Sequence, residues 1–548
     1  MSALVLGFDG FDLDLVRELG PSRLPVLHRW MQEGAYAALE SVKPPATLPN
    51  WATFLTGADP GTHGVFDFTT RRGYAVHFSG GTVRETPTIF ARLDRMGVRT
   101  ACLGFPGTYP PEPLSHGVFM SGWDAPVAFE ADRTFVHPPA LYDELTARFG
   151  AIRFDDVDEF HADREGFHDA LPDVLVRRIA RKVELARHLL ETRSIEVFGL
   201  YFGESDTASH HLYSLHDPRS PRNPGRTTDG LARVYEALDR AAGELSAMMP
   251  GAEITIVSDH GSGGSSDVSL HLNAALAEAG LLAFREVRAR SRLVSLAKDV
   301  ALTWLPPKLR ERIFRFGDAL LPSWLESKAR FGAIDFARTL AFSDELNYFP
   351  AIHLNLRGRE PEGTVDPGER DAVILRVEAA LRALRDPETG APVVRAIHRR
   401  EDLYEGPFVD RAPDLVVDLH LRDGYSYNLV PSDPASPRTF SRLEPAEYLG
   451  RKGRSMPGSH RSHGFFLAVG PRVEAVGECE ATIADASATL LARLGVKPAD
   501  DAAGRVLFEI LGESLSLDAE LPEATFAPKR AGNPSFLERR LRALGYVD

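Results

Sequence analysis

Six residues with metal-ligating side chains stand out in this sequence of 548 residues. Imidazole nitrogens and carboxylate oxygens both bind zinc-like cations, and a catalytic cation usually takes about three protein ligands plus one open position. Two cations about 3.5–4 Å apart can hold the attacking and leaving oxygens of a phosphoryl displacement. The six residues are Asp9, Asp206, His210, Asp259, His260 and His460. Together with the hydroxyl of Thr47, they indicate two-metal phosphoryl chemistry.

The elements that must position these ligands are strands that end beside them. Apolar and β-branched runs at residues 4–8, 196–202 and 253–258 stop just before Asp9, Asp206 and Asp259. In open α/β sheets, ligands bind outside the carboxyl ends of the strands. We therefore expect segments that are distant in sequence to meet at one edge of a sheet.

Two pairs of these ligands lie close together in the sequence, and their spacing has different consequences. Asp206 and His210 are four residues apart, so on a helix they share a face and can bind one cation. Asp259 and His260 are adjacent, and a regular strand would point them to opposite faces. The glycine-rich sequence GSGG at residues 261–264 permits the backbone to turn there.

The rest of the chain alternates between strand and helix patterns. Helices at 171–193 and 234–249 precede strands at 196–202 and 253–258, as strand–crossover units require. The alternation predicts an α/β fold, with further helices and strands at 86–97, 98–106, 349–356, 371–386, 412–419, 464–470 and 481–496.

Composition is that of an ordinary soluble enzyme. The net charge of −14 gives no reason to expect a nucleic-acid polymer as partner. Cys102 and Cys479 are too few for a disulfide framework, which favours a reducing compartment. Residues 1–10 lead directly into a strand pattern, and no run reaches the roughly 20 apolar residues of a membrane span. We expect a cytoplasmic protein without a secretory signal.

Several segments resemble the alkaline phosphatase superfamily, in particular its type I phosphodiesterase/nucleotide pyrophosphatase branch. GFDGFD at residues 7–12 is similar to the first ligand motif of that branch. Further segments are similar, in the family's order, to its nucleophile segment, its two ligand pairs and its closing segment: 43–68, 201–211, 257–261 and 458–471. The resemblance implies a three-layer α/β/α sandwich with a large mixed, mostly parallel sheet and a helical insertion.

The resemblance also implies how the ligands divide and what Thr47 does. One site would contain Asp9, Asp259 and His260 beside Thr47, and the other would contain Asp206, His210 and His460. Thr47 would attack phosphorus and form a phosphothreonine that water then hydrolyses, without a separate general base. The cofactors would be two divalent cations; mixed His/Asp ligands suit Zn²⁺ best, and Mn²⁺ or iron can occupy similar sites.

The sequence also departs from the family pattern and leaves alternatives open. His463 also precedes the closing strand and is a substitute for His460 as the last ligand. Phe68 stands where nucleotide pyrophosphatases place an asparagine that holds a phosphate oxygen. Asn50 is a candidate substrate-binding amide, or else a residue at the start of a helix. Sulfatases carry Cys-x-Pro-x-Arg where this chain has Thr-Leu-Pro-Asn, which argues against sulfate ester hydrolysis.

Each motif has a plainer interpretation when taken alone. An Asp-Gly pair is usually a turn, Asp-x-x-x-His is usually a solvated helix face, and Thr47 would most often cap the following helix. The joint occurrence in order, at strand ends, favours the metal sites. Other histidines are expected to be structural or at the surface, with His211 a candidate for substrate contact: His63, His211, His271 and His353.

One basic, proline-interrupted segment at 285–332 breaks the alternating pattern. Its apolar faces are typical of a helical cap over the site, of an insertion packed on the core, or of a peripheral membrane contact. We expect a core at 1–284 and 333–515, this insertion between them, and a tail at 516–548. Segments within 333–408 and the closing residues 537–548 also resemble the predicted phosphohydrolase/phosphomutase group of the superfamily.

These features predict a metal-dependent hydrolase of a small-molecule phosphate ester, with a phosphodiester of nucleotide or lipid-headgroup type favoured. A phosphomonoesterase or phosphomutase is the alternative within enzymes; a mutase would return the phosphoryl group to product instead of to water. An inactive protein that holds a phosphorylated ligand through its metals is the alternative outside enzymes, and an intact Thr47 argues against it.

Overall fold

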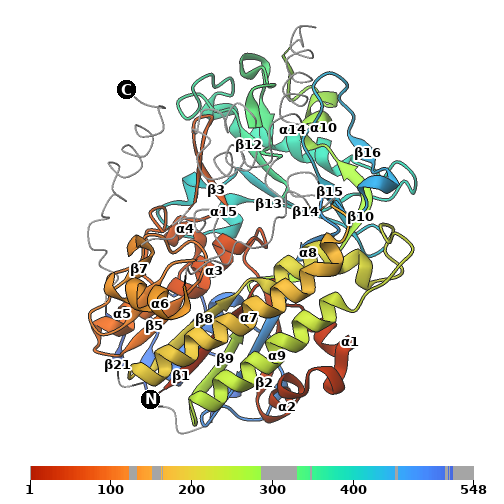
Figure 1. Ribbon diagram of the computed structural model, residues 1–548. Helices are drawn as coiled ribbons and strands as arrows, with labels where there is room; N and C mark the ends of the chain where they lie inside the picture. Colours follow the sequence, from red (N-terminus) through yellow and green to blue (C-terminus); the bar gives the residue numbers. More distant parts are fainter. Residues whose placement is uncertain are drawn as a thin grey trace.

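The computed structural model describes residues 2–79, 81–122, 133–150, 162, 164–285, 330–345, 349–450, 455–500, 502–512, 516–517 and 519–522. Most of the predicted insertion at 285–332 and most of the predicted tail at 516–548 lie outside these residues. The described chain forms a large α/β body, lower in Figure 1, with a smaller α/β unit above it.

The large body is built on a nine-stranded sheet. All of its strands run in one direction except β18 and β7, each antiparallel to its neighbours. The strand order across the sheet is β19 (Gly477–Glu478), β2 (Ala35–Glu40), β18 (His463–Val469), β9 (Glu253–Val257), β1 (Ala3–Phe8), β8 (Val197–Phe202), β5 (Thr100–Leu103), β6 (Val118–Met120), β7 (Val136–His137).

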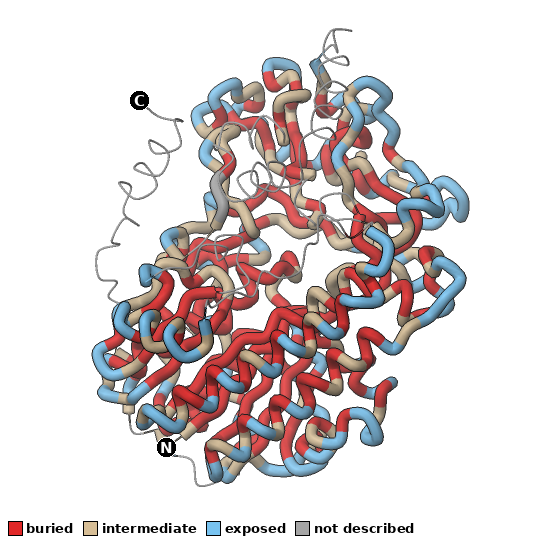
Figure 2. The backbone as a smooth tube through the Cα atoms, viewed as in Figure 1, coloured by how far each residue is buried: buried red, intermediate tan, exposed pale blue. Residues whose placement is uncertain are grey.

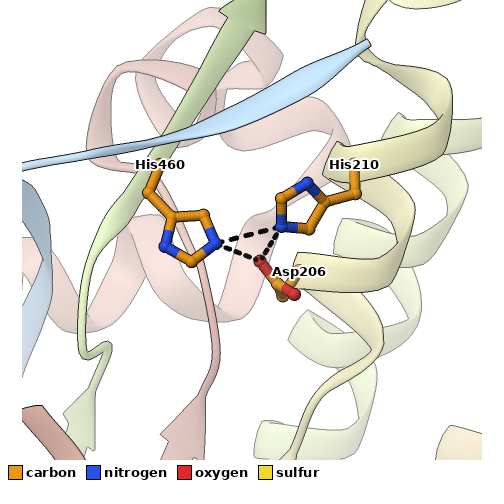
Figure 3. A group of neighbouring side chains, drawn as sticks. All are labelled: Asp206, His210 and His460. Carbon is orange, nitrogen blue, oxygen red and sulfur yellow. Dashed lines mark hydrogen bonds and ion pairs between the residues drawn. The ribbon is translucent and has the colours of Figure 1, made fainter. Parts of the chain in front are cut away.

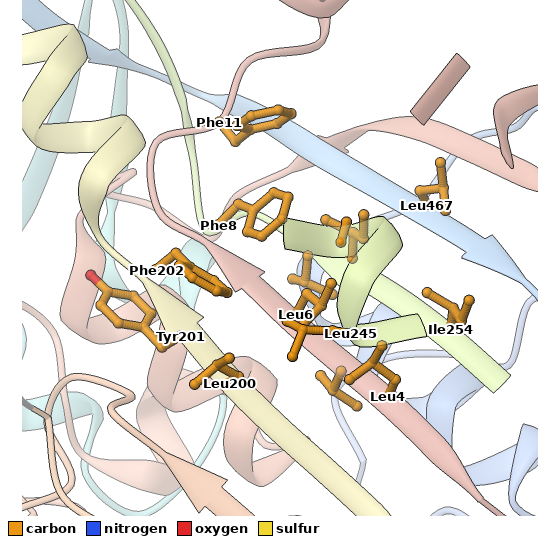
Figure 4. Packing of buried hydrophobic residues seen from close by; sticks show 14 of the residues in the cluster. Leu4, Leu6, Phe8, Phe11, Leu200, Tyr201, Phe202, Leu245, Ile254 and Leu467 are labelled. Atoms are coloured by element: carbon orange, nitrogen blue, oxygen red, sulfur yellow. The ribbon is translucent and has the colours of Figure 1, made fainter. Parts of the chain in front are cut away.

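The centre of this sheet is apolar because its strands are covered on both faces. β1 lies between β8 and β9, with Leu6 in register with Leu200 on one side and with Ile256 on the other. Strands buried on both faces read as continuous apolar runs instead of alternating ones, and all six residues of β1 are buried. Figure 4 shows Leu4, Leu6 and Phe8 packed among neighbouring side chains, each burial worth about 1.5–3 kcal/mol.

Helices cover the two faces and complete three layers. One face carries α1 (Leu13–Arg23), α2 (Pro25–Glu33), α7 (Phe167–Thr192) and α9 (Gly230–Met248), which contact one another or the central strands. The other face carries α3 (Thr47–Thr56), α5 (Ile89–Arg95) and α16 (Ile483–Arg493). Figure 2 shows the buried residues concentrated between these layers. The predicted α/β/α sandwich with a mixed, mostly parallel sheet is confirmed.

The smaller unit has its own sheet and its own apolar cluster. Its four strands are β11 (Ala341–Phe342), β12 (Ala351–Leu354), β14 (Leu415–Leu419) and β13 (Val394–Arg399), in that order. They pack with α10 (Leu272–Glu278) and α14 (Arg370–Arg382) around a cluster separate from the main core. The segment predicted as the second part of the core, 333–515, thus contributes to both units.

A third sheet joins the two units. The ten-residue strand β10 (Gly261–Leu270) leaves the large body and pairs with β15 (Ser426–Leu429), β16 (Phe440–Arg442) and β17 (Gly458–Arg461). The hairpin of β3 (Thr69–Arg72) and β4 (Ala75–Phe78) also extends to the smaller unit, where the Tyr74 ring stacks on Phe336. Shorter elements are α4 (Pro60–His63), α6 (Ala140–Phe149), α15 (Arg400–Leu403), β20 (Val496–Lys497) and β21 (Ala519–Glu520).

The GSGG sequence does not form the turn that its composition suggests. The chain turns one step earlier, at residues 258–260, and the glycines open β10. Their missing side chains permit close packing, because a Cβ on Gly261 would lie 2.0 Å from the His463 carbonyl oxygen. A Cβ on Gly263 would lie 2.5 Å from the Arg461 guanidinium. Among the described residues, no helix has the length and apolar character needed to cross a bilayer.

Candidate metal centre and nucleophile

Three predicted ligands form one cluster at the carboxyl edge of the sheet. Asp206 and His210 lie on α8 (Glu204–His216), which follows β8, and His460 lies on β17. The Asp206 Oδ1 atom is 3.3 Å from His210 Nε2 and 3.6 Å from His460 Nε2, and the two Nε2 atoms are 3.0 Å apart. Figure 3 shows the three side chains pointing to a common point from these two elements.

The other three predicted ligands form a second cluster. Asp9 follows β1, and Asp259 and His260 form the turn after β9. His260 Nε2 is 3.4 Å from Asp9 Oδ1 and 3.2 Å from Asp259 Oδ2. The rings of His260 and His460 stack with centroids 3.5 Å apart, so the two clusters are neighbours. The division into two sets of three is the one that the family resemblance implies.

Hydrogen bonds to backbone carbonyls determine which nitrogen of each histidine faces its cluster. The Nδ1 atoms of His210 and His460 lie 3.0 and 2.9 Å from the carbonyl oxygens of Gly458 and Pro45. His260 Nδ1 lies 3.0 Å from the Gly261 carbonyl oxygen. A carbonyl can only accept, so each Nδ1 carries the proton, and each ring turns its Nε2 atom toward its cluster.

Burial and charge give these side chains the properties of cation ligands. Burial lowers the pKa of His260 to about 3, so the ring is neutral and available to a metal. Burial, and then the charge of Asp9, raise the pKa of Asp259 well above its ordinary value. Within the described part of the chain, Asp259 Oδ2 accepts no hydrogen bond although it is buried. Two triplets of carboxylates and neutral imidazoles fit divalent cations, which would relieve this crowding of charge.

The two clusters differ in access to solvent. The Asp9, Asp259 and His260 side chains are 2%, 0% and 0% exposed. Asp206 and His210 are 24% and 17% exposed, so a ligand from solvent meets their cluster first.

Thr47 lies beside the buried cluster at the start of a helix. Its Oγ1 atom is 3.4 Å from His260 Nε2, and it is the first residue of α3, after Ala46 in extended conformation. The first backbone N–H groups of a helix have no partner within the helix, and the helix dipole is positive there. Both effects favour a phosphoryl group held next to the Thr47 hydroxyl.

Asn50 holds the loop that leads to Thr47. Its Oδ1 accepts a 2.8 Å hydrogen bond from the Val42 N–H, and its Nδ2 donates to the Ala46 carbonyl at 2.8 Å and to the Pro44 carbonyl at 3.3 Å. The side chain is fully buried. Both ends of the amide therefore bind backbone, which suits a role in shaping the nucleophile loop.

The other histidines singled out in the sequence belong to neither cluster. His63 is buried and bonded to Thr53 Oγ1 at 3.0 Å. His211 is buried and packs edge-on against Phe167 of α7, on a different face of α8 from His210. His463, at the start of β18, is exposed, and its Nδ1 atom lies 3.0 Å from the Ser462 hydroxyl. The histidine that lies beside Asp206 is His460 and not His463. His271 and His353 lie at or within the smaller unit.

Sequence reasoning missed the groups that hold the ligands. Trp51 Nε1 and the Tyr201 hydroxyl both donate to Asp9 Oδ2. The available signal was an aromatic residue with a polar atom within otherwise apolar segments, since such atoms usually need a partner when buried. Four serine hydroxyls also donate to backbone carbonyls around the ligands, a role without a sequence signal: Ser205 to Asp9, Ser41 to Asp259, Ser258 to His260 and Ser262 to Gly10.

One family and several solved structures are similar to this chain. A model of the family described as type I phosphodiesterase / nucleotide pyrophosphatase matches residues 3–440. Murine ectonucleotide pyrophosphatase / phosphodiesterase 5 matches with a TM-score of 0.48 and 14% identity, covering 93% of this chain and 100% of that chain. The human ectonucleotide pyrophosphatase / phosphodiesterase 5 matches with a TM-score of 0.47 and 14% identity, covering 92% and 97%. No curated protein matches the sequence.

The family match extends over most of the chain and contains Thr47 and every candidate ligand except His460. His460 follows the matched region and reaches the cluster through the pairing of β17 with β10. The chain belongs to the type I phosphodiesterase / nucleotide pyrophosphatase family, a family of metal-dependent phosphoesterases within the alkaline phosphatase superfamily.

Proposed function

We propose that this protein hydrolyses a phosphodiester through a phosphothreonine at Thr47, with two divalent cations held by the two ligand clusters. The observation that supports it most is the position of the Thr47 hydroxyl, 3.4 Å from a lone-pair-bearing nitrogen of the buried cluster. A threonine hydroxyl is a weak nucleophile until its pKa is lowered, and cations at this position would lower it.

The residues of the chain would act in two displacements. Thr47 Oγ1 forms a bond to phosphorus while the bond from phosphorus to the leaving alkoxide breaks; the hydroxyl proton goes to solvent, and the alkoxide takes one up. Water then forms a bond to phosphorus and gives up a proton, the Thr47 Oγ1–phosphorus bond breaks and Oγ1 takes a proton back, and a phosphate monoester is released. The phosphoryl group stays beside Thr47 in both steps, so the start of α3 would hold its oxygens in each of them.

Asp9, Asp259 and His260 would hold one cation, and Asp206, His210 and His460 the other. When bound, these cations supply charge stabilisation at the attacking and leaving oxygens. Zinc is the proposed metal because the donors are imidazole nitrogens and carboxylate oxygens. The backbone carbonyls that accept from each Nδ1 keep the three rings oriented for this task.

The test compares turnover of a nitrophenyl phosphodiester with that of the matched nitrophenyl monoester by zinc-loaded protein, with Thr47→Ala as the blank. We expect preference for the diester, as the family description supports. Preference for the monoester would move the protein to the phosphatase or mutase alternative. Acid quenching during turnover of the diester, followed by peptide mass spectrometry, should find on Thr47 a phosphoryl group that still carries the ester substituent that did not leave; turnover without this adduct would contradict the covalent intermediate.

A further inference from the structure

We propose that Trp51 and Tyr201 are positioning residues that fix the Asp9 carboxylate as a ligand of the buried cation. This inference rests on the proposed two-cation centre. Trp51 Nε1 donates to Asp9 Oδ2 at 2.9 Å, and the Tyr201 hydroxyl donates to the same oxygen at 2.6 Å. Both donors are almost fully buried, as is Asp9.

Two donors on one oxygen orient the whole carboxylate. They come from different elements, Trp51 from α3 and Tyr201 from β8, so they restrict rotation of the Asp9 side chain from two directions. The other oxygen, Oδ1, is then directed at His260 Nε2, 3.4 Å away. Hydrogen bonds of this kind determine which oxygen of a ligating carboxylate meets the metal.

The indole itself is held rigidly against the strand that carries Asp9. Its ring packs edge-on against Phe105 and Tyr201, at centroid distances of 5.3 and 5.5 Å. A Cβ on Gly7 of β1 would lie 2.8 Å from the Trp51 ring, so the glycine lets the indole lie directly on the strand. A ring fixed in this way presents its N–H to Asp9 at a constant place.

The helix α3 connects this contact with the nucleophile. Trp51 follows Thr47 by four residues, which is about one helical turn, and both belong to α3, in which every residue is buried. The bond from Trp51 to Asp9 therefore sets the position of α3 relative to the buried cluster. Through this bond, one residue would align both a cation ligand and the attacking hydroxyl.

The experiment measures zinc affinity of Trp51→Phe and Tyr201→Phe by competition with a chelating dye. Both changes keep an aromatic ring and remove one donor. The measurement is made in two backgrounds: His460→Ala, which keeps all three ligands of the buried cluster, and His260→Ala, which keeps all three ligands of the Asp206 cluster. We expect zinc affinity to fall about 10–100-fold in the first background and to stay unchanged in the second.

Matched controls come from elsewhere in the chain. Trp30→Phe changes a buried indole of α2, and Tyr427→Phe removes a 2.8 Å hydroxyl–carboxylate bond to Asp386 in the region of β15. Neither should alter zinc affinity in either background. The free energy of unfolding, measured by urea titration, identifies any variant that loses affinity because it is misfolded. If one of the two variants Trp51→Phe and Tyr201→Phe is misfolded, the other one provides the test.

The outcomes separate this inference from the proposed function. Wild type that binds fewer than two zinc ions would contradict the two-cation centre itself. Wild type that binds two, with unchanged affinity in Trp51→Phe and Tyr201→Phe, would overturn the positioning role alone. Equal losses in both backgrounds would also overturn it, because they would indicate a general structural effect.

Discussion

The Nε2 atoms of His210 and His460 lie 3.0 Å apart, although the Nδ1 atom of each ring lies within hydrogen-bond distance of a backbone carbonyl. Each Nδ1 must carry the proton, so two neutral rings would bring two lone pairs together. Burial, and then the neighbouring His260, lower the pKa of His460 well below its ordinary value, which disfavours a proton between the rings. A divalent cation bound by both Nε2 atoms would resolve this contact, with Asp206 as the proposed third ligand.

The first prediction concerns the number of zinc ions bound. His460→Ala should reduce the zinc content from two ions to one, because it removes a ligand from the more exposed cluster. His463→Ala is the matched control, since His463 is exposed and lies outside both clusters. Zinc content after gel filtration, measured by atomic emission, checks this. Loss of an ion only in His463→Ala would reassign the last ligand.

Thr47 should be required for turnover and not for metal binding. Thr47→Ala removes the attacking oxygen, and loss of a nucleophile typically lowers kcat by roughly 10³-fold or more. Thr47→Ser keeps the hydroxyl and should retain measurable activity. Initial rates with the nitrophenyl diester, together with zinc content, check both expectations. Turnover by Thr47→Ala close to that of wild type would exclude Thr47 as nucleophile.

Asn50 should act on the nucleophile loop. Asn50→Asp replaces the amide that donates to Ala46 and Pro44, and misplacement of a reacting group by about 1 Å can lower kcat roughly 100-fold. Asn355→Asp is the control, because its amide also donates to backbone carbonyls but lies in the smaller unit. A higher KM with unchanged kcat would instead support direct substrate binding by Asn50.

A buried ion pair next to the site should contribute to stability. Lys182 of α7 lies 2.8 Å from Glu204 at the start of α8, and both side chains are fully buried. Lys182→Met removes the positive charge that balances the buried Glu204 carboxylate and should lower the free energy of unfolding by about 3–5 kcal/mol. Arg187→Met on the same helix removes an exposed pair with Glu244 and should cost at most about 1 kcal/mol. Equal effects in urea unfolding would contradict the prediction.

His63 should make stability depend on pH. Burial, and then the charge of Arg84, lower its pKa from the ordinary 6.5 to about 3. Between these values the unfolded chain binds one more proton than the folded one, so stability falls as pH is lowered below about 6.5. The slope from this group is about 1.4 kcal/mol per pH unit. His63→Gln should reduce the slope of unfolding free energy against pH by that amount; an unchanged slope would contradict it.

The sequence by itself determined the elements and the chemistry of the candidate ligands. Runs of apolar residues before Asp9, Asp206 and Asp259 predicted the central parallel strands, because a strand covered on both faces has no polar alternation. The four-residue spacing of Asp206 and His210 predicted their shared helical face. These are local properties, and local periodicity is present in the sequence.

Only the tertiary structure decided which distant groups meet. His460 rather than His463 joins the cluster because β17 pairs with β10, placing His460 opposite Ser262. GSGG forms a strand because two neighbouring segments approach its glycines closely, and no local pattern encodes that approach. The donation of Trp51 and Tyr201 to Asp9 depends on packing between α3, β8 and β1. Such contacts join residues far apart in sequence, so their geometry follows from the folded packing and not from spacing along the chain.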